Sequence, residues 1–211
     1  MLTVTLIRHG QSVSNTAKRF GSQSDVPLSP LGQLQAQLAG ETLAHSGVTR
    51  IVSSDLSRAA DTARAVALSV GLSVETYPAL RERNVGVLTG LTFEEAMSRY
   101  PQDYGDLMSG DPYRKIGGGE SFHEMMLRVD ALMANLLQDT RGHLVLVSHM
   151  AVLQHLLRRA CGVQEANLRN AVSFSIANAA LHRLRFDRVT ARWHILALND
   201  TAHLRNLQDA V

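Results

Sequence analysis

The chain has 211 residues, of which 45% are hydrophobic and 19% are charged, with a formal net charge of +2 and a pI of about 9.0. This length suits one domain of ordinary size, and the hydrophobic content excludes an intrinsically disordered chain. The small basic excess is not gathered in any one stretch, so we expect no nucleic-acid partner.

The sequence contains no apolar run of about 18 residues, and its start, MLTVTLIRHG, lacks the features of a signal peptide. We therefore expect a soluble cytoplasmic protein with no membrane partner. The single cysteine, Cys161, cannot form a disulfide within the chain, which fits a reducing compartment. Because it lies in the apolar run AVLQHLLRRACG, we expect it to be a small core residue.

The first third of the chain alternates strand and helix patterns. The β-branched run TVTLI at 3–7 is typical of a buried strand. The segment SPLGQLQAQLAGETLAHSG then predicts a helix with Ser29 at its N-cap, Pro30 at the first helical position and Gly47 beyond its end. The next expected elements are a strand at 49–54, a helix at 55–71 that stops at Gly71, and a strand at 73–77.

Two capping boxes mark helix starts in the middle of the chain. Thr92 to Glu95 opens a short helix that ends before Pro101, and Ser121 to Glu124 opens a long helix with an apolar, methionine-rich stripe. Between them, 102–119 is the least structured stretch, and we expect it to form a small lid insertion over one end of a sheet. We expect its GGGE motif (117–120) to be a flexible loop, because it lacks the lysine of a nucleotide-binding loop.

The last part of the chain returns to strands. The most continuous apolar strand, HLVLV at 143–147, precedes a helix at 150–161. The segments 174–187 and 191–199 indicate two C-terminal strands around a turn near Asp187. Strands separated by helices predict an α/β fold, a three-layer sandwich with a mostly parallel central sheet and helices on both faces, in one domain over 1–211.

Charged side chains follow three of these strands where each gives way to a helix. Arg8 and His9 end the first strand, Arg58 lies in the first turn of the helix after the second, and His149 follows HLVLVS. In parallel sheets, ligands bind beyond the carboxyl ends of the strands. Helix N-termini and arginine side chains at that edge favour an anion, in particular a phosphate group.

The segment RHGQSVSN at 8–15 resembles the signature of the histidine phosphatase superfamily, which includes the cofactor-dependent phosphoglycerate mutases. Further segments that match the family's blocks follow in the family's order: RFGSQSDVPLSPLGQLQA, SSDLSRAADTA, LRERNVGVLTG, GGGESFHEMMLRV and LVLVSHM. Two positions depart from the family's usual pattern: Met150 stands where glycine is usual and Asp61 where glutamine is common.

The resemblance implies roles for particular residues. It makes His9 the nucleophile, Glu82 the general acid and base, and His149 a catalytic and phosphate-binding residue. It also implies that Arg8, Arg58 and Asn15 bind phosphate and that Ser22 and Gln23 contact the substrate.

The chemistry of these residue types leads to the same picture. His9 must be neutral to attack phosphorus, and two neighbouring arginines should lower its pKa below about 6.5. Its other ring nitrogen should donate to a backbone carbonyl. We expect His149 to be protonated and to share with Arg8 and Arg58 the binding of the phosphate oxygens. The other histidines show no metal-ligand spacing, so we expect neither a metal nor a cofactor.

We therefore predict a metal-independent phosphatase that hydrolyses small phosphomonoesters through a phosphohistidine. The alternatives are a cofactor-dependent phosphoglycerate mutase and, from another class, a phosphate-sensing protein that has lost the reaction. The expected partner is a small phosphorylated metabolite. The resemblance also implies a homodimer, the state that is common in the family.

Overall fold

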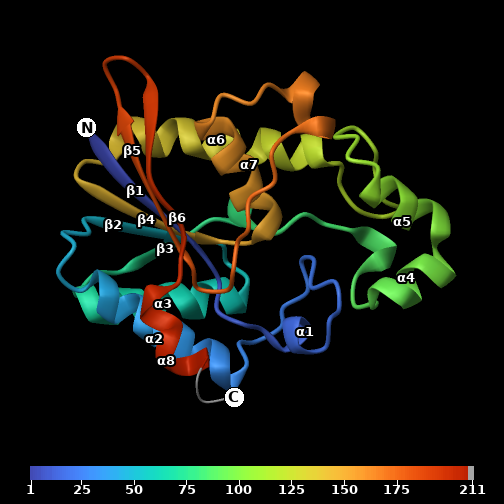
Figure 1. The fold of residues 1–211 in the computed structure, drawn as a ribbon, viewed down its shortest axis with the longest axis horizontal. Helices are drawn as coiled ribbons and strands as arrows, with labels where there is room; N and C mark the ends of the chain where they lie inside the picture. Colours follow the sequence, from blue (N-terminus) through green and yellow to red (C-terminus); the bar gives the residue numbers. More distant parts are fainter. Residues whose placement is uncertain (209–211) are drawn as a thin grey trace.

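A six-stranded sheet forms the middle layer of the computed structural model, which describes residues 1–208 (Figure 1). The strand order is β3-β2-β4-β1-β5-β6. Strands β1 to β4 are mutually parallel, and β5 and β6 extend the sheet in the antiparallel sense. The strands are β1 (Leu2–Arg8), β2 (Arg50–Ser53), β3 (Val74–Thr76), β4 (His143–Ser148), β5 (Leu181–Asp187) and β6 (Arg192–Asp200).

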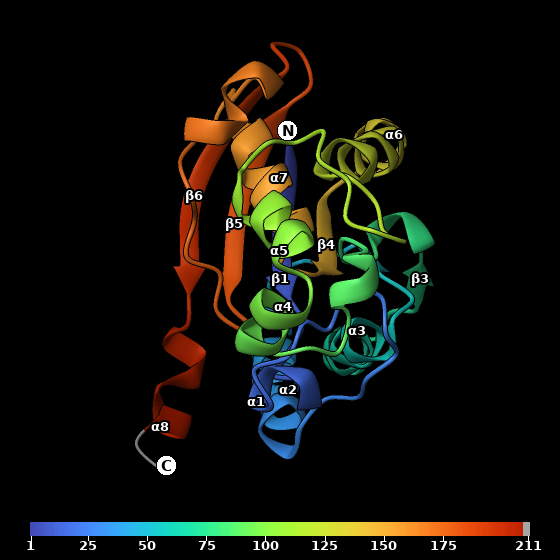
Figure 2. The ribbon, with the colours of Figure 1, turned by 90° about the vertical axis from the view of Figure 1, so that its right-hand side faces the viewer.

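Helices cover both faces of this sheet, which confirms the predicted three-layer α/β architecture (Figures 1 and 2). On one face lie α2 (Pro30–Leu43) and α3 (Ser57–Val70), and on the other α6 (Phe122–Asp139) and α7 (Met150–Ala160). Each face buries its own apolar cluster, and the predicted methionine-rich stripe of α6 lies in one of them. The remaining helices are α1 (Val13–Thr16), α4 (Phe93–Arg99), α5 (Pro101–Met108) and α8 (Arg205–Gln208), with 3-10 turns at 78–80, 86–88, 165–170 and 202–204.

The register of β1 against β4 brings two histidines together. Arg8 lies opposite Ser148 at the carboxyl ends of the two parallel strands. The backbone N–H of His9 then donates to the carbonyl of Ser148 at 3.0 Å. His9 and His149, which follow these strand ends, are therefore neighbours even though the sequence separates them widely.

The expected lid insertion is more ordered than the sequence indicates. Pro101 ends α4, as predicted, but it also occupies the first position of α5, where proline needs no N–H partner and its fixed φ suits a helix. Within the expected insertion at 102–119, α5 covers the first part up to Met108, and only 109–119 lacks regular helix or strand structure. Helices α4 and α5 lie in front of the carboxyl end of β1 (Figure 2).

Two further expectations were wrong. The strand expected over 174–187 begins only at Leu181, because Ala179 takes a positive φ of 56° and its N–H bonds to the carbonyl of Arg8 rather than to a strand partner. Cys161 is exposed rather than in the core, because α7 ends at Ala160 and the chain turns at Gly162 with a φ of 75°. Within residues 1–208, no helix is long and apolar enough to cross a membrane.

Candidate active site

The His9 imidazole is fixed in one tautomer. Its Nδ1 lies 2.7 Å from the carbonyl oxygen of Gly10, which can only accept, so Nδ1 carries the proton and Nε2 carries a lone pair. Gly10 is itself held, because its N–H donates to the Thr62 hydroxyl at 3.0 Å. A side chain at Gly10 would collide with the carbonyl of Gly32 in α2 at 2.3 Å. The backbone beneath the nucleophile candidate is therefore rigid.

His149 faces His9 with both ring nitrogens unused. The two ring centroids are 5.1 Å apart, and the His149 side chain is fully buried. Within residues 1–208, neither ring nitrogen of His149 has a hydrogen-bond partner. A buried polar group without a partner costs stability, and such groups in native proteins commonly face a ligand site. An anion bound here would satisfy it.

Both imidazoles are neutral near neutral pH. Burial is the largest cause that lowers the pKa of His9 well below its ordinary value, and the positive charges of Arg58 and Arg8 lower it further. The expected direction is confirmed, but burial outweighs the arginines. Burial also lowers the pKa of His149 well below its ordinary value, together with the nearby His9, Arg58 and Arg8. The protonated His149 was expected in the complex with a phosphate group, so that expectation stays a prediction.

The buried Arg58 and the partly buried Arg8 supply the positive charge. The guanidinium of Arg58 donates to the carbonyls of Ser22 at 2.7 Å and Ser24 at 2.8 Å, which fixes its orientation. Arg8 donates to the carbonyl of Ile176 at 2.8 Å, and its buried Nε has no partner within 1–208. Burial lowers the pKa of both side chains, yet an arginine stays charged near neutral pH. Both line one cavity of about 620 Å³ together with His9.

The Glu82 carboxylate lies in the same cavity, at the N-terminus of α7. Its Oε1 accepts from the backbone N–H of Arg83 at 2.9 Å and of Ala151 at 3.1 Å. The Ala151 N–H is in the first turn of α7, where the helix dipole favours a negative charge. Glu82 is thereby held beside Met150, the residue that replaces the family's usual glycine.

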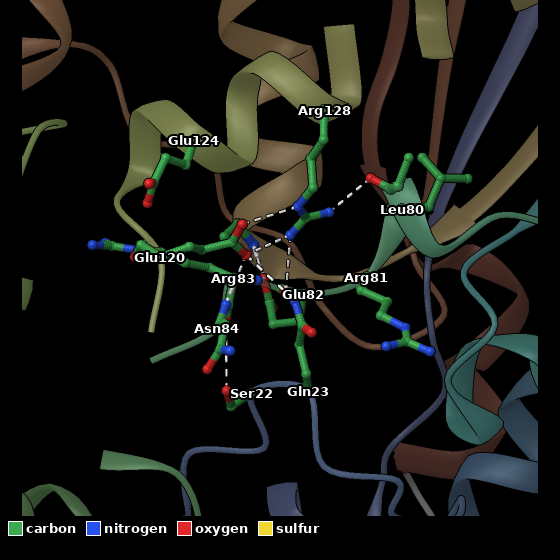
Figure 3. Close-up of polar contacts among 12 residues, drawn as sticks. Ser22, Gln23, Leu80, Arg81, Glu82, Arg83, Asn84, Glu120, Glu124 and Arg128 are labelled. Carbon is green, nitrogen blue, oxygen red and sulfur yellow. Dashed lines mark hydrogen bonds and ion pairs between the residues drawn. The ribbon is translucent and has the colours of Figure 1, made fainter. Parts of the chain in front are cut away.

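An ion pair holds the backbone on either side of Glu82 (Figure 3). Arg128 of α6 donates to the carbonyls of Ala79 at 2.7 Å and Glu82 at 3.1 Å and pairs with Glu120 at 2.6 Å. Glu120 in turn accepts from the N–H of Asn84 at 2.9 Å. The GGGE motif was expected to be a flexible loop, but its glutamate belongs to this ion pair. No local pattern in the sequence indicates that Glu120 and Arg128 meet the segment of Glu82.

The other predicted site residues lie around this centre. Asn15 and Ser22 line the cavity, but parts of their side chains are already engaged: Asn15 Oδ1 accepts from Ser12, and the Ser22 hydroxyl accepts from the N–H of Val85 at 3.0 Å. The amide of Gln23 donates to the carbonyl of Glu82 at 3.0 Å. Ser22 and Gln23 thus tie the loop after α1 to the segment that carries Glu82, and their contact with substrate stays a prediction.

Two residues that the sequence did not single out support His9. Asn178 donates to the carbonyl of His9 at 2.9 Å and to Oδ1 of Asn15 at 3.2 Å. Thr62 accepts from Gly10 and donates to the carbonyl of Arg58 at 2.7 Å. Among the described residues 1–208, no group of three or more His, Cys, Asp or Glu side chains is arranged to hold a metal ion.

Comparison with known proteins places the chain in a family. The model of the histidine phosphatase superfamily (branch 1) matches residues 4–201. A probable phosphoglycerate mutase of Yersinia pestis is 35% identical over 211 residues, which cover 97% of this chain and 95% of that protein.

Solved structures with the same fold include two phosphatases. A mycobacterial glucosyl-3-phosphoglycerate phosphatase superposes with a TM-score of 0.84 at 30% identity, covering 94% of this chain and 99% of that one. A putative alpha-ribazole-5'-P phosphatase of Escherichia coli superposes with a TM-score of 0.81 at 25% identity, covering 95% and 98%. The chain therefore belongs to branch 1 of the histidine phosphatase superfamily and is an enzyme that acts on phosphate esters.

Proposed function

We propose that this enzyme is a metal-independent phosphatase that hydrolyses small phosphomonoesters through a phosphohistidine on His9. The observation that carries the proposal is the state of His9: it is buried, neutral and fixed in the tautomer that leaves Nε2 free to attack. The unpartnered His149 and the guanidinium groups of Arg8 and Arg58 surround it with donors for a phosphate group.

In the first step, Nε2 of His9 forms a bond to phosphorus as the bond from phosphorus to the ester oxygen breaks. The electron pair of that bond goes to the leaving oxygen, which takes a proton from the protonated Glu82 carboxyl and departs as an alcohol. Arg8, Arg58 and His149 stabilise the charge on the three equatorial oxygens. The imidazole does not release a proton, because the proton on Nδ1 stays bonded to the Gly10 carbonyl.

In the second step, water takes the place of the alcohol. The Glu82 carboxylate accepts a proton from the water as its oxygen bonds to phosphorus, and the nitrogen–phosphorus bond breaks with its electron pair returning to Nε2. Inorganic phosphate leaves, and His9 and Glu82 regain their starting states. No metal takes part in either step, so full activity in the presence of EDTA is the expected result.

Phosphoglycerate mutase activity is the second candidate, favoured by the name of the 35% identical relative from Yersinia pestis. A mutase must keep water from its phosphohistidine while a bisphosphorylated intermediate reorients, which requires a well-covered site. In this enzyme the cover over the cavity comes from α4 and α5, where Phe93 and Met108 are about half exposed. This open cover supports water as the acceptor.

Incubation with 3-phosphoglycerate, with and without 2,3-bisphosphoglycerate, separates the two activities. A phosphatase releases inorganic phosphate in both reactions and needs no bisphosphate. Formation of 2-phosphoglycerate faster than phosphate release would establish the mutase instead. If the protein acts neither on 3-phosphoglycerate nor on p-nitrophenyl phosphate, the phosphate-sensing alternative is the one supported.

A further inference from the structure

Part of the wall of the cavity that holds the phosphate site is apolar. We call this part of the wall the apolar shelf; it consists of Phe20, Phe93, Leu107, Met108, Phe122 and Met150. Phe93 is 49% exposed and Met108 53% exposed, and both belong to helices that cover the cavity. Large apolar side chains that stay exposed together around a pocket commonly mark a binding surface.

The shelf is held in place from behind rather than being a mobile rim. The rings of Phe20 and Phe93 meet edge to face with centroids 4.8 Å apart. Phe20 and Leu107 also pack against a small buried cluster beneath α4 and α5, formed by Val85, Leu88, Ala96 and Ile116. The exposed faces of Phe93 and Met108 are therefore presented by an ordered support, which lowers the cost of binding a partner group.

Most polar side chains in the outer part of the cavity are already bonded within the protein. Arg19 pairs with Glu95 at 2.7 Å. Both ends of the Gln154 amide bond to the backbone of Phe174. Arg83 donates to two backbone carbonyls. These bonds use part of the hydrogen-bonding capacity of each group and fix its orientation, so the apolar side chains form the largest part of the wall that has no partner within the protein.

One cation in the wall could favour a different substrate. Arg158 donates through Nε to the carbonyl of Val172 at 2.9 Å, and no acidic side chain within 1–208 pairs with it. It would suit a second anionic group on the substrate. The shelf is larger, comes from four helices and one loop, and lines the same cavity as Arg8, His9 and Arg58, so it outweighs this single side chain.

We infer that the preferred substrates are phosphomonoesters whose alcohol carries an apolar or aromatic body that packs against the apolar shelf. This inference rests on the proposed function, since it names the substrate class of the same site. It requires the phosphate to lie beside His9 between Arg8 and Arg58 while the alcohol extends along Phe93 and Met108, which line the same cavity.

Two pairs of compounds test it. Propyl phosphate and 3-phenylpropyl phosphate have leaving alcohols of closely similar acidity. A difference in kcat/KM between them therefore reflects contacts of the phenyl group with the enzyme and not the reactivity of the leaving group. We expect the phenyl compound to be favoured by about 10-fold or more, the effect of burying part of an aromatic ring. Butylphosphonate and 4-phenylbutylphosphonate, whose phosphorus–carbon bond cannot be hydrolysed, should show the same preference in calorimetric binding to the wild-type enzyme.

Variants on α4 provide the matched comparison. Phe93→Ala should reduce the preference for the phenyl compounds to about 3-fold or less, through KM and Kd and not kcat. Met97→Ala removes a similarly exposed apolar side chain from the same helix, but one outside the cavity lining, and should leave the preference unchanged. Equal inhibition by vanadate in all three proteins would show that the phosphate pocket is intact.

The two readouts separate the inference from the proposed function. A binding preference for 4-phenylbutylphosphonate that Phe93→Ala removes, seen without any hydrolysis, would support the shelf and refute the phosphatase. Hydrolysis of both esters with equal kcat/KM would support the phosphatase and overturn the shelf. 4-Phosphonobutanoate carries a second anionic group that would suit Arg158. If it binds more tightly than 4-phenylbutylphosphonate, the inference is overturned in favour of recognition by Arg158.

Discussion

The side-chain amide of Asn178 donates to the backbone carbonyl of His9 at 2.9 Å, across 169 positions of sequence. The same nitrogen reaches Oδ1 of Asn15 at 3.2 Å. Asn178 precedes Ala179, whose N–H bonds to the backbone carbonyl of Arg8 at 3.0 Å. The chain that leads into β5 is therefore anchored on the segment that carries the nucleophile candidate.

Asn178→Ala should lower kcat by about 10-fold or more, because a small displacement of a nucleophile is costly to the reaction. Asn178 makes its bonds to the protein and not to phosphate, so KM and inhibition by inorganic phosphate should change little. Steady-state kinetics with one alkyl phosphate gives both constants, with Ser175→Ala, a neighbouring exposed residue, as the control. An unchanged kcat in Asn178→Ala would show that the contact does not position His9.

Glu82→Gln should lower kcat/KM on alkyl phosphates by roughly 10²- to 10⁴-fold, the usual contribution of a general acid. The amide retains the shape of the carboxyl but cannot supply the proton that an alkoxide needs. The loss on p-nitrophenyl phosphate should be much smaller, because its leaving group is stable without a proton. Equal losses on both substrates would indicate that Glu82 has a structural role, for example through its contacts with Arg83 and Ala151.

Arg58→Ala should lower kcat/KM by about 10² or more, as the loss of one donor to a developing oxyanion typically does. Inhibition by vanadate and by inorganic phosphate should weaken in parallel, because Arg58 lines the cavity in the free enzyme. Arg64→Ala, on the exposed side of the same helix, is the matched control. Wild-type affinity of the Arg58 variant for both anions would place Arg58 outside the phosphate pocket.

His182 should make the protein less stable in acid. Burial lowers its pKa from 6.5 to about 4, so between these values the unfolded chain binds more protons than the folded protein. The stabilisation is complete above pH 6.5 and is lost as the pH falls, by roughly 2 kcal/mol between pH 8 and pH 5.

Urea unfolding at the two pH values measures this loss. The difference between pH 8 and pH 5 should shrink by about that amount in His182→Asn, whatever the variant's absolute stability. The surface variant His45→Asn should retain the wild-type difference. The same pH dependence in His182→Asn as in the wild type would rule out His182 as its source.

The sequence predicts the order of elements and the central residues of the site because both depend on local pattern. Alternation of strands and helices places Arg8, His9, Arg58 and His149 at the carboxyl edge of a parallel sheet. In the structure, Arg8, His9 and Arg58 line one cavity, and the buried His149 ring lies 5.1 Å from the His9 ring. The capping boxes at Thr92 and Ser121 both form as predicted.

The parts that depend on long-range contacts could not be predicted in this way. Asn178 and Arg128 reach the site only through the tertiary fold. Arg128 lies in the quoted block GGGESFHEMMLRV, but nothing local in that block indicates which segment its side chain contacts. The lowered pKa of His149 could not be predicted either, because burial, which the sequence does not reveal, is its largest cause. Pro101 was expected to end one helix, and the start of a second at the same residue could not be told from an irregular loop.

The central claim is that His9 carries the phosphoryl group. Brief incubation with a ³²P-labelled phosphomonoester, followed by an alkaline quench that preserves phosphohistidine, traps the intermediate, and peptide mapping locates the label. The ³²P label should appear on His9 within one turnover, and the His9→Ala variant should show neither label nor turnover. Label on His149 or on a serine, or turnover that persists in His9→Ala, would contradict it.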